Sequence, residues 1–171
     1  MPVTLVFMDA VDKILVQWQQ ARPDLDVTAM GPVGRLSRVF HHNARRMGET
    51  FGKYGLNAAG FDVLATLRRS DPPHALSPGD LMASMMITSG TMTNRIEQLA
   101  KAGLVKRTTD PKDARRAVVE LTVKGFELIE AAIADHVVRQ KLLLSVLSEG
   151  EIEQLDSALR KLMQAAEHEN D

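Results

Sequence analysis

The spacing of apolar residues along this 171-residue chain predicts a fold built mainly from amphipathic helices. Within residues 7–18, Phe, Val, Ile and Trp side chains recur every three or four positions, which places them on one helix face. This helix is expected to end before Pro23, because the residue preceding a proline is disfavoured in the helical region. Residues 22–32 then form a linker, and a second helical pattern over residues 33–54 is expected to end at Gly55.

The middle of the chain predicts three shorter helices, each with a recognisable start or stop. Asn57 is suited to cap a helix that ends near residues 70–73, where two prolines follow. The sequence Ser-Pro-Gly-Asp at residues 77–80 combines a capping hydroxyl, a proline at the first helical position and an acid in the first turn. A further helix is expected over residues 89–102, with Gly103 as its stop.

The pattern then changes to short strands over residues 104–109 and 117–121, which a polar loop joins into a predicted β-hairpin. A long helix is expected over residues 123–147. A last helix starts at Ser148, which forms the pair typical of a capping box with Glu151. Its apolar residues repeat at three, four and three positions, a seam suited to a partner helix: Ile152, Leu155, Leu159 and Leu162.

A short helix, a tight turn, a second helix and a hairpin follow one another in the order of a winged helix-turn-helix. We therefore predict a mainly α fold with a small β-hairpin wing. At 100° per residue, the apolar side chains of the second helix fall within roughly 60° of arc and are expected to face the core: Met92, Ile96 and Leu99. Roughly 105–165° away lie small hydroxyl and amide side chains that can approach bases and phosphates, with Gly90 beside them: Thr91, Asn94 and Gln98. A solvated helix face would look the same, so both interpretations stay open.

The tip of the predicted hairpin favours DNA, because three basic residues crowd it: Lys112, Arg115 and Arg116. Such a tip can follow the phosphate backbone and place an arginine in a narrow minor groove. Asp113 can orient Arg115 through a charge-assisted hydrogen bond. A solvated turn is again the alternative interpretation.

Composition narrows the functional classes. With no cysteine, the chain has no disulfide, no Cys-ligated zinc, no iron–sulfur cluster and no thiol redox sensor. Seven aromatic residues (one Trp, one Tyr, five Phe) are few for the stacking platforms of single-strand binders. The net charge of −1 speaks against a nucleic-acid partner only as a total, because residues 88–124 carry eight Lys and Arg against four Asp and Glu. Residues 148–171 carry two Lys and Arg against seven Asp and Glu, so the neutral total combines a basic middle with an acidic tail.

No enzyme signature is evident. The sequence lacks a Gly-rich phosphate loop, a nucleophile elbow and a His-Glu-x-x-His motif, so we expect no catalysis, no cofactor and no metal site. The adjacent His41 and His42 point about 100° apart on a helix, which does not suit one metal. No targeting or membrane-spanning stretch is evident, and we expect a cytoplasmic protein.

Residues 89–99 and 102–107 resemble the recognition helix and first wing strand of MarR-type transcriptional regulators, and residues 110–115 are similar to their wing motif. The resemblance covers about residues 57–122. It implies a homodimer that reads a pseudo-palindromic operator in double-stranded DNA, with two recognition helices about one DNA turn apart. Repression is the family default.

The resemblance also assigns roles within this segment. It adds Ser89 and Thr93 to the DNA-binding residues and makes Asp113 and Arg115 the wing pair. Pro111 stands where many members carry arginine, a difference that would weaken one phosphate contact. Residues 55–122 would then form the DNA-binding lobe, with helices of residues 1–54 and 123–171 in the dimerisation region.

The N-terminal part resembles the urate-responsive branch of this family, through its extra helix and residues 22–26, 34–38 and 61–64. That resemblance implies a small-molecule ligand that releases the protein from DNA. It assigns ligand-binding roles to four positions: Trp18, Asp62, Arg95 and Arg107. The helical geometry permits this, because Arg95 lies roughly 65° from the core direction of its helix. Arginines suit a planar oxyanionic purine, through bidentate donors and stacking.

We hypothesise that Asp62 pairs with an arginine in the free protein and that urate or a related purine competes for it. Each residue has a simpler alternative. Trp18 could only pack an interface, Asp62 could act on the helix dipole, Arg95 could contact a phosphate, and Arg107 could be an exposed strand residue. At the level of function, the alternatives are a regulator that answers phenols or aromatic acids, and a helical dimer scaffold that binds no DNA.

Overall fold

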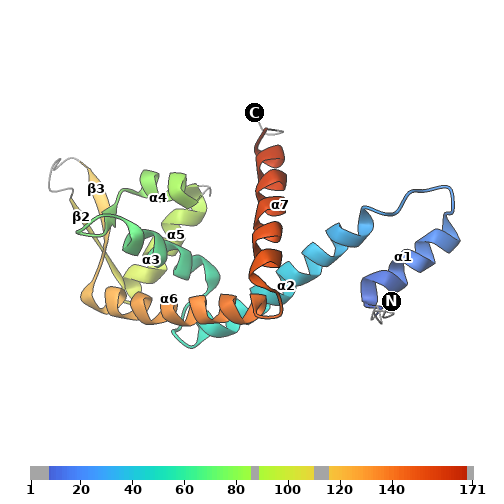
Figure 1. Ribbon diagram of the computed structural model, residues 1–171. Coiled ribbons are helices and arrows are strands. Elements are labelled where there is room, and N and C mark those ends of the chain that lie inside the picture. The colour runs from blue at the N-terminus through green and yellow to red at the C-terminus, as the bar shows by residue number, and fades with distance from the viewer. Residues whose placement is uncertain (1–7, 86–88, 110–115, 169–171) are drawn as a thin grey trace. The chain divides into compact units, whose positions relative to one another are not determined.

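The computed structural model describes residues 8–85, 89–109 and 116–168 (Figure 1). Contacts divide the chain into two compact units, Met1–Arg46 and Met47–Asp171. This division reflects which residues pack together. The predicted boundaries at residues 54 and 122 separate a DNA-binding lobe from dimerisation helices, and they stay a prediction.

The first unit contains α1 (Ala10–Ala21) and the start of α2 (Met30–Gly52). Asp9 caps α1, because its side chain accepts hydrogen bonds from the backbone amides of Val11 and Asp12. Arg35 of α2 binds the same carboxylate, with Nε 2.8 Å from Asp9 Oδ2, and lowers the pKa of Asp9 to about 2. The ion pair and the cap together hold α1 against α2.

The start of α2 corrects one prediction. The expected linker over residues 22–32 ends earlier, because α2 begins at Met30 and Pro32 lies in its first turn. Proline is tolerated there, since the amides of the first turn have no acceptor within the helix.

The second unit contains the end of α2 and the central helices. These are α3 (Ala58–Arg69), α4 (Pro78–Met85), α5 (Ser89–Lys101) and α6 (Val123–Leu144). The predicted caps are confirmed at Asn57, whose Oδ1 accepts from the Gly60 amide at 2.8 Å, and at Ser77, whose Oγ accepts from the Asp80 amide at 3.1 Å. Gly103 follows α5 with φ of 71°, the left-handed conformation that glycine adopts without strain.

A small antiparallel sheet closes this lobe. It contains β1 (Ala75–Leu76), β2 (Val105–Thr109) and β3 (Ala117–Leu121) in the order β1-β3-β2. The predicted hairpin is confirmed, with Arg107 opposite Val119. β1 was not predicted, because two residues are too few to show a strand period.

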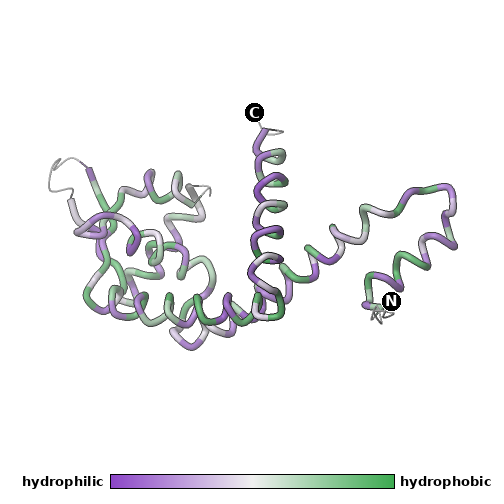
Figure 2. The backbone as a smooth tube through the Cα atoms, viewed as in Figure 1, coloured by the Kyte–Doolittle hydropathy of each residue, from purple (hydrophilic) through white to green (hydrophobic). Residues whose placement is uncertain are grey.

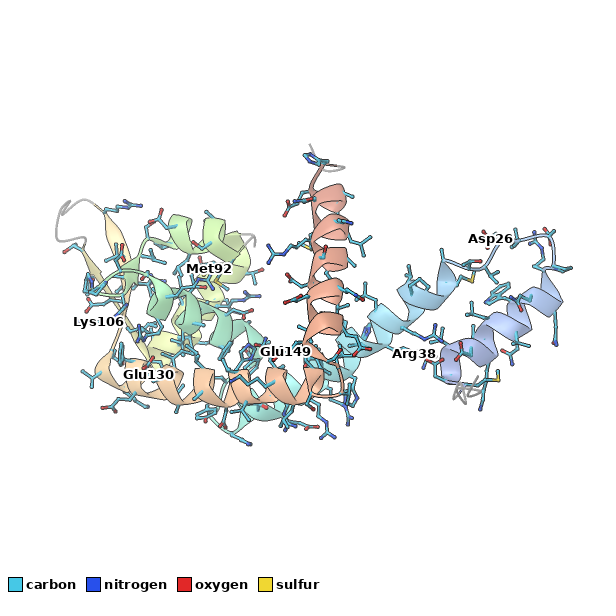
Figure 3. The ribbon with its side chains drawn as sticks, in the orientation of Figure 1. Asp26, Arg38, Met92, Lys106, Glu130 and Glu149 are labelled. Carbon is cyan, nitrogen blue, oxygen red and sulfur yellow. The ribbon has the colours of Figure 1, made fainter. Side chains whose placement is uncertain are left out.

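The core of the second unit lies between the sheet and the central helices, and Figure 2 shows hydrophobic segments gathered there. Its fully buried side chains include Leu64 and Leu67 of α3, Leu81 of α4 and Ile129 of α6. Met92, marked in Figure 3, and Ile96 are each 1% exposed, which confirms the predicted apolar face of α5. The predicted mainly helical fold with a small hairpin is therefore confirmed.

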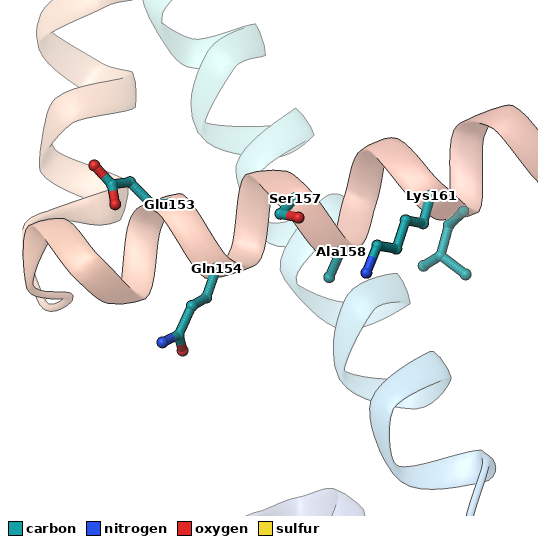
Figure 4. A pocket seen from close by; sticks show the side chains of 6 residues that line it. Glu153, Gln154, Ser157, Ala158 and Lys161 are labelled. Carbon is teal, nitrogen blue, oxygen red and sulfur yellow. The ribbon is translucent and has the colours of Figure 1, made fainter.

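The last helix, α7 (Glu149–His168), begins with the predicted capping box, in which the Ser148 amide donates to Glu151 Oε2 at 2.8 Å and the Glu151 amide donates to Ser148 Oγ at 3.4 Å. No residue of α7 is buried, and Leu162 is 60% exposed. The shallow depression in Figure 4 is lined by residues of this helix alone, among them Glu153 and Lys161. Of the helices that the structure describes, none combines the length and apolar character needed to cross a membrane.

Candidate functional site

The exposed face of α5 carries most of the residues predicted to contact DNA. Ser89 and Gly90 open the helix, and the polar side chains that follow are exposed: Thr91, Thr93, Asn94 and Gln98. They lie opposite the buried apolar face, so α5 presents hydroxyl and amide groups outward from a fixed base. Such a face can donate to and accept from the base edges of a major groove.

Of the predicted wing residues, Arg116 alone lies within the described residues; Lys112, Asp113 and Arg115 lie outside them. Arg116 precedes β3, and its Nη2 is 2.6 Å from Asp80 Oδ2 and 3.1 Å from Ser77 Oγ. The structure thus places Arg116 in a contact with the start of α4.

A cleft of about 680 Å³ lies beside α5, among helices of the second unit. Two residues predicted to bind ligand, Asp62 of α3 and Arg95 of α5, line it together. Arg69 and His136 line it as well, so one carboxylate faces three basic side chains. Phe61 and Phe51 form part of its apolar wall.

The pKa of Asp62 depends on burial and on the basic side chains that line the cleft. Burial raises the pKa of Asp62, and three neighbouring charges oppose that rise: Arg95, His136 and Arg69. Asp62 remains exposed as a residue, so the cleft removes only part of the water around its carboxylate. Among the described residues, Asp62 forms no ion pair with an N–O distance of 4.0 Å or less. The hypothesised pairing of Asp62 with an arginine therefore stays a prediction. The three bases act on Asp62 through their charges, Arg69 from α3 itself, Arg95 from α5 and His136 from α6.

His136 of α6 lies against aromatic rings at the wall of the cleft. Its ring centroid is 4.9 Å from that of Phe61 and 5.7 Å from that of Phe51, and these two phenyl rings stack at 4.1 Å. The His136 Nδ1 is buried without a hydrogen-bond partner. Burial lowers the pKa of His136, while the Asp62 charge raises it, so the imidazole favours its neutral form.

A third predicted ligand residue, Arg107, does not line this cleft. Arg107 of β2 lines a separate cavity of about 220 Å³, together with Thr93, Pro78 and strand residues of β3. Trp18 belongs to α1 in the first unit and is 42% exposed. The structure therefore brings Asp62 and Arg95 together, without Arg107.

Sequence reasoning missed His136 and Arg69 as cleft residues. A signal for His136 was present, because positions 129, 132, 133 and 136 follow the spacing of one helix face, and the first three are apolar. A histidine that continues an apolar stripe faces the interior. Arg69 gave no such signal, since a basic residue in the last turn of a helix is common for reasons of the helix dipole.

The coupling between Asp62 and His136 gives a testable pH dependence. The substitution Asp62→Asn removes the charge that favours the imidazolium, so the pKa of His136 is expected to fall further below its usual value. NMR titration of the His136 ring protons measures this shift. Asp71→Asn, at an exposed position after α3, is the matched control and should leave the titration of His136 unchanged. An unchanged or raised pKa of His136 in Asp62→Asn would show that the two groups are not coupled.

Comparison with known proteins places this geometry among DNA-binding regulators. The profile of the MarR family matches residues 54–116. Over 152 residues the chain is 40% identical to the HTH-type transcriptional regulator PecS of Dickeya dadantii (strain 3937), covering 89% of this chain and 92% of PecS.

Two solved structures show the same arrangement of elements. A mutant MarR of Escherichia coli in complex with operator DNA superposes with a TM-score of 0.67 at 25% identity, covering 80% of this chain and 96% of that one. BpsR of Bordetella bronchiseptica, whose DNA binding is regulated by 6-hydroxynicotinic acid, superposes with a TM-score of 0.65 at 27% identity, covering 76% and 91%.

Proposed function

Because this chain belongs to the MarR family of winged helix-turn-helix transcriptional regulators, we propose that it is a cytoplasmic repressor that binds a pseudo-palindromic operator as a homodimer. The exposed polar face of α5 supports DNA binding, as does the operator complex of the related MarR. The unburied apolar residues of α7, such as Leu155 and Leu162, support a dimer. Two copies of α5 would then enter successive major grooves about 34 Å apart.

We further propose that a small anionic aromatic molecule, urate or a related purine, releases the protein from DNA. The observation that carries this proposal is the cleft shared by Asp62, Arg95, Arg69 and His136. Its volume of about 680 Å³ lies in the usual range of small-molecule sites, and its walls combine aromatic rings with a few charged groups. Guanidinium groups bind planar oxyanions through paired donors, and the phenyl rings offer flat apolar surface.

The cleft and the DNA face share one helix, which suggests how binding is coupled to release. Arg95 lines the cleft, while Asn94 and Gln98 on the same helix point outward. A ligand that draws Arg95 toward its anionic edge changes the position of α5. The ligand must bind the DNA-free conformation more tightly than the DNA-bound one. The ratio of these two ligand affinities sets how far operator affinity can fall.

A second candidate effector class is supported by the smaller cavity at Arg107. Its arginine, with the Thr93 hydroxyl nearby, suits the carboxylate of a single-ring aromatic acid or the hydroxyl of a phenol. The related BpsR responds to such an acid. The volume of about 220 Å³ falls below the usual range of ligand sites, so we favour the larger cleft.

Two experiments test the proposal. In a mobility-shift assay, the protein should bind the DNA upstream of its own gene, and added urate should dissociate this complex. Calorimetric titration with urate, xanthine and salicylate should then rank the ligands, and the purines should raise the melting temperature. If salicylate binds and neither purine does, the regulator answers aromatic acids instead.

Charge reversal at Arg115 separates a DNA-binding regulator from a helical scaffold. We expect Arg115→Glu to lower operator affinity by at least tenfold, because it replaces an attractive phosphate or minor-groove contact with a repulsive charge. Dimer mass by light scattering should not change. Unaltered operator affinity in this variant would show that Arg115 of the wing does not contact DNA. If the wild type does not bind the operator, the helical scaffold is favoured instead.

A further inference from the structure

The contact between Arg116 and the start of α4 joins two elements that are far apart in the sequence. Arg116 lies directly before β3, the central strand of the sheet, and its Nη2 donates to Asp80 Oδ2 at 2.6 Å. A second hydrogen bond runs from the same nitrogen to Ser77 Oγ at 3.1 Å. One guanidinium nitrogen thus binds both polar side chains of the α4 cap.

The acceptor is itself held in place. Ser77 Oγ donates to Asp80 Oδ2 at 2.8 Å, and the Asp80 amide donates back to Ser77 Oγ at 3.1 Å. These bonds and the Arg116 charge lower the pKa of Asp80, so the carboxylate stays ionised at neutral pH. Arg116 therefore meets a charge whose position the helix cap has already set.

We propose that Arg116 is a positioning residue, which bonds the start of β3 to the first turn of α4 and holds the hairpin in register with the helix pair α4–α5. This inference rests on the proposed DNA binding of the lobe, and it replaces the predicted direct contact between Arg116 and DNA. In a helix-turn-helix, the first helix crosses the DNA backbone and the second enters the groove. A hairpin that is tied to the first helix keeps a constant distance from both.

The pair is suited to orientation more than to stability. Both side chains are about half exposed, at 49% for Arg116 and 47% for Asp80. Exposed ion pairs contribute little to folding, because water screens them and both side chains lose freedom. The bond nevertheless selects one arrangement of β3 on α4, which a recognition surface built from two elements requires.

The test compares operator affinity of Arg116→Ala, Asp80→Asn and the double variant by fluorescence anisotropy at several salt concentrations. We expect each single substitution to weaken binding by about two- to fivefold, the effect of an exposed ion pair. The double variant should bind the operator as tightly as the single variant with the lower affinity, because each single substitution already removes the same bond. The slope of log affinity against log salt should stay unchanged, since no phosphate contact is lost.

Glu127→Gln is the matched control for charge. Glu127 is exposed on α6, away from the residues predicted to contact DNA, so this variant also removes one negative charge from the second unit and should leave affinity equal or higher. Weaker binding by Asp80→Asn is then due to lost positioning, because its charge change alone acts in the opposite direction. The proposal is overturned if Asp80→Asn binds as tightly as Glu127→Gln, or if Arg116→Ala reduces the salt slope by about 0.9, the value for one phosphate.

A second measurement does not depend on DNA. Amide hydrogen exchange at Ala117 and Val118 should become faster in Asp80→Asn and in Arg116→Ala, and remain as in the wild type in Glu127→Gln. If the wild type binds no operator, the proposed function is wrong. The hydrogen-exchange rates still show whether the bond from Arg116 to Asp80 holds β3 in place. Unaltered exchange in both variants would show that the bond does not hold β3.

Discussion

Replacing Arg95 with alanine is expected to weaken urate binding by about 10- to 150-fold. Hydrogen bonds to a charged group contribute roughly 1.5–3 kcal/mol, which corresponds to that range of affinity. Arg95 lines the cleft with Asp62 and is held by a helix whose other face is buried in the core. Calorimetry without DNA measures this loss directly, so a separate effect of Arg95 on operator binding does not enter.

Arg107→Ala is the matched control for this prediction. It removes the same guanidinium from the separate cavity beside β3, and urate affinity should change by less than about twofold if that cavity is not used. Equal losses in both variants would contradict the assignment of the ligand to the larger cleft. They would instead support the role that the resemblance gives to Arg107. A salicylate titration that responds to Arg107→Ala alone would identify the smaller cavity as the site of aromatic acids.

Gly125→Ala is expected to destabilise the fold by about 3 kcal/mol or more. A Cβ at this position would lie 1.9 Å from the carbonyl oxygen of Leu104 and 2.8 Å from its carbonyl carbon. Both atoms belong to the backbone, so no side-chain rotation relieves the overlap, and α6 must move away from the turn that precedes β2. That movement breaks the hydrogen bond from Thr122 Oγ1 to the Gly103 carbonyl, at 2.7 Å.

Urea denaturation measures the effect, with Gly48→Ala as the control. Gly48 lies within α2, and an added Cβ meets no atom within 4 Å. Alanine there should raise the free energy of unfolding by roughly 0.5–1 kcal/mol, the difference in helix preference. A Gly125→Ala protein as stable as the wild type would mean that the turn and α6 adapt at no cost.

Local signals predicted the elements of the fold well. Caps at Asn57, Ser77 and Ser148 depend on side chains that bind amides within three residues, so their geometry is contained in the sequence. The buried face of α5 followed from helical spacing in the same way. The prediction for the linker over residues 22–32 was wrong at its end, because Pro32 is as compatible with a first helical turn as with a loop.

The candidate site was predictable only in part. Asp62 and Arg95 came from a resemblance, and the structure places both at one cleft. His136 comes from a helix more than forty residues further along the chain, and no local pattern links it to Asp62. Arg116 followed a charge pattern that predicted DNA contact, but its partner Asp80 lies 36 positions away, so only folding could reveal the ion pair.

The sequence by itself determined most of the helices and the two hairpin strands, though not β1 or the start of α2. It also determined which faces of these helices are apolar and that the chain resembles a DNA-binding regulator. These properties arise from interactions between residues a few positions apart, which spacing and capping record. The tertiary structure decided which polar side chains meet. It separated Arg107 from the cleft of Asp62, added His136 and Arg69 to that cleft, and turned Arg116 toward α4. The physical reason is that electrostatic and hydrogen-bond partners depend on distance in space, which the packing of distant helices sets.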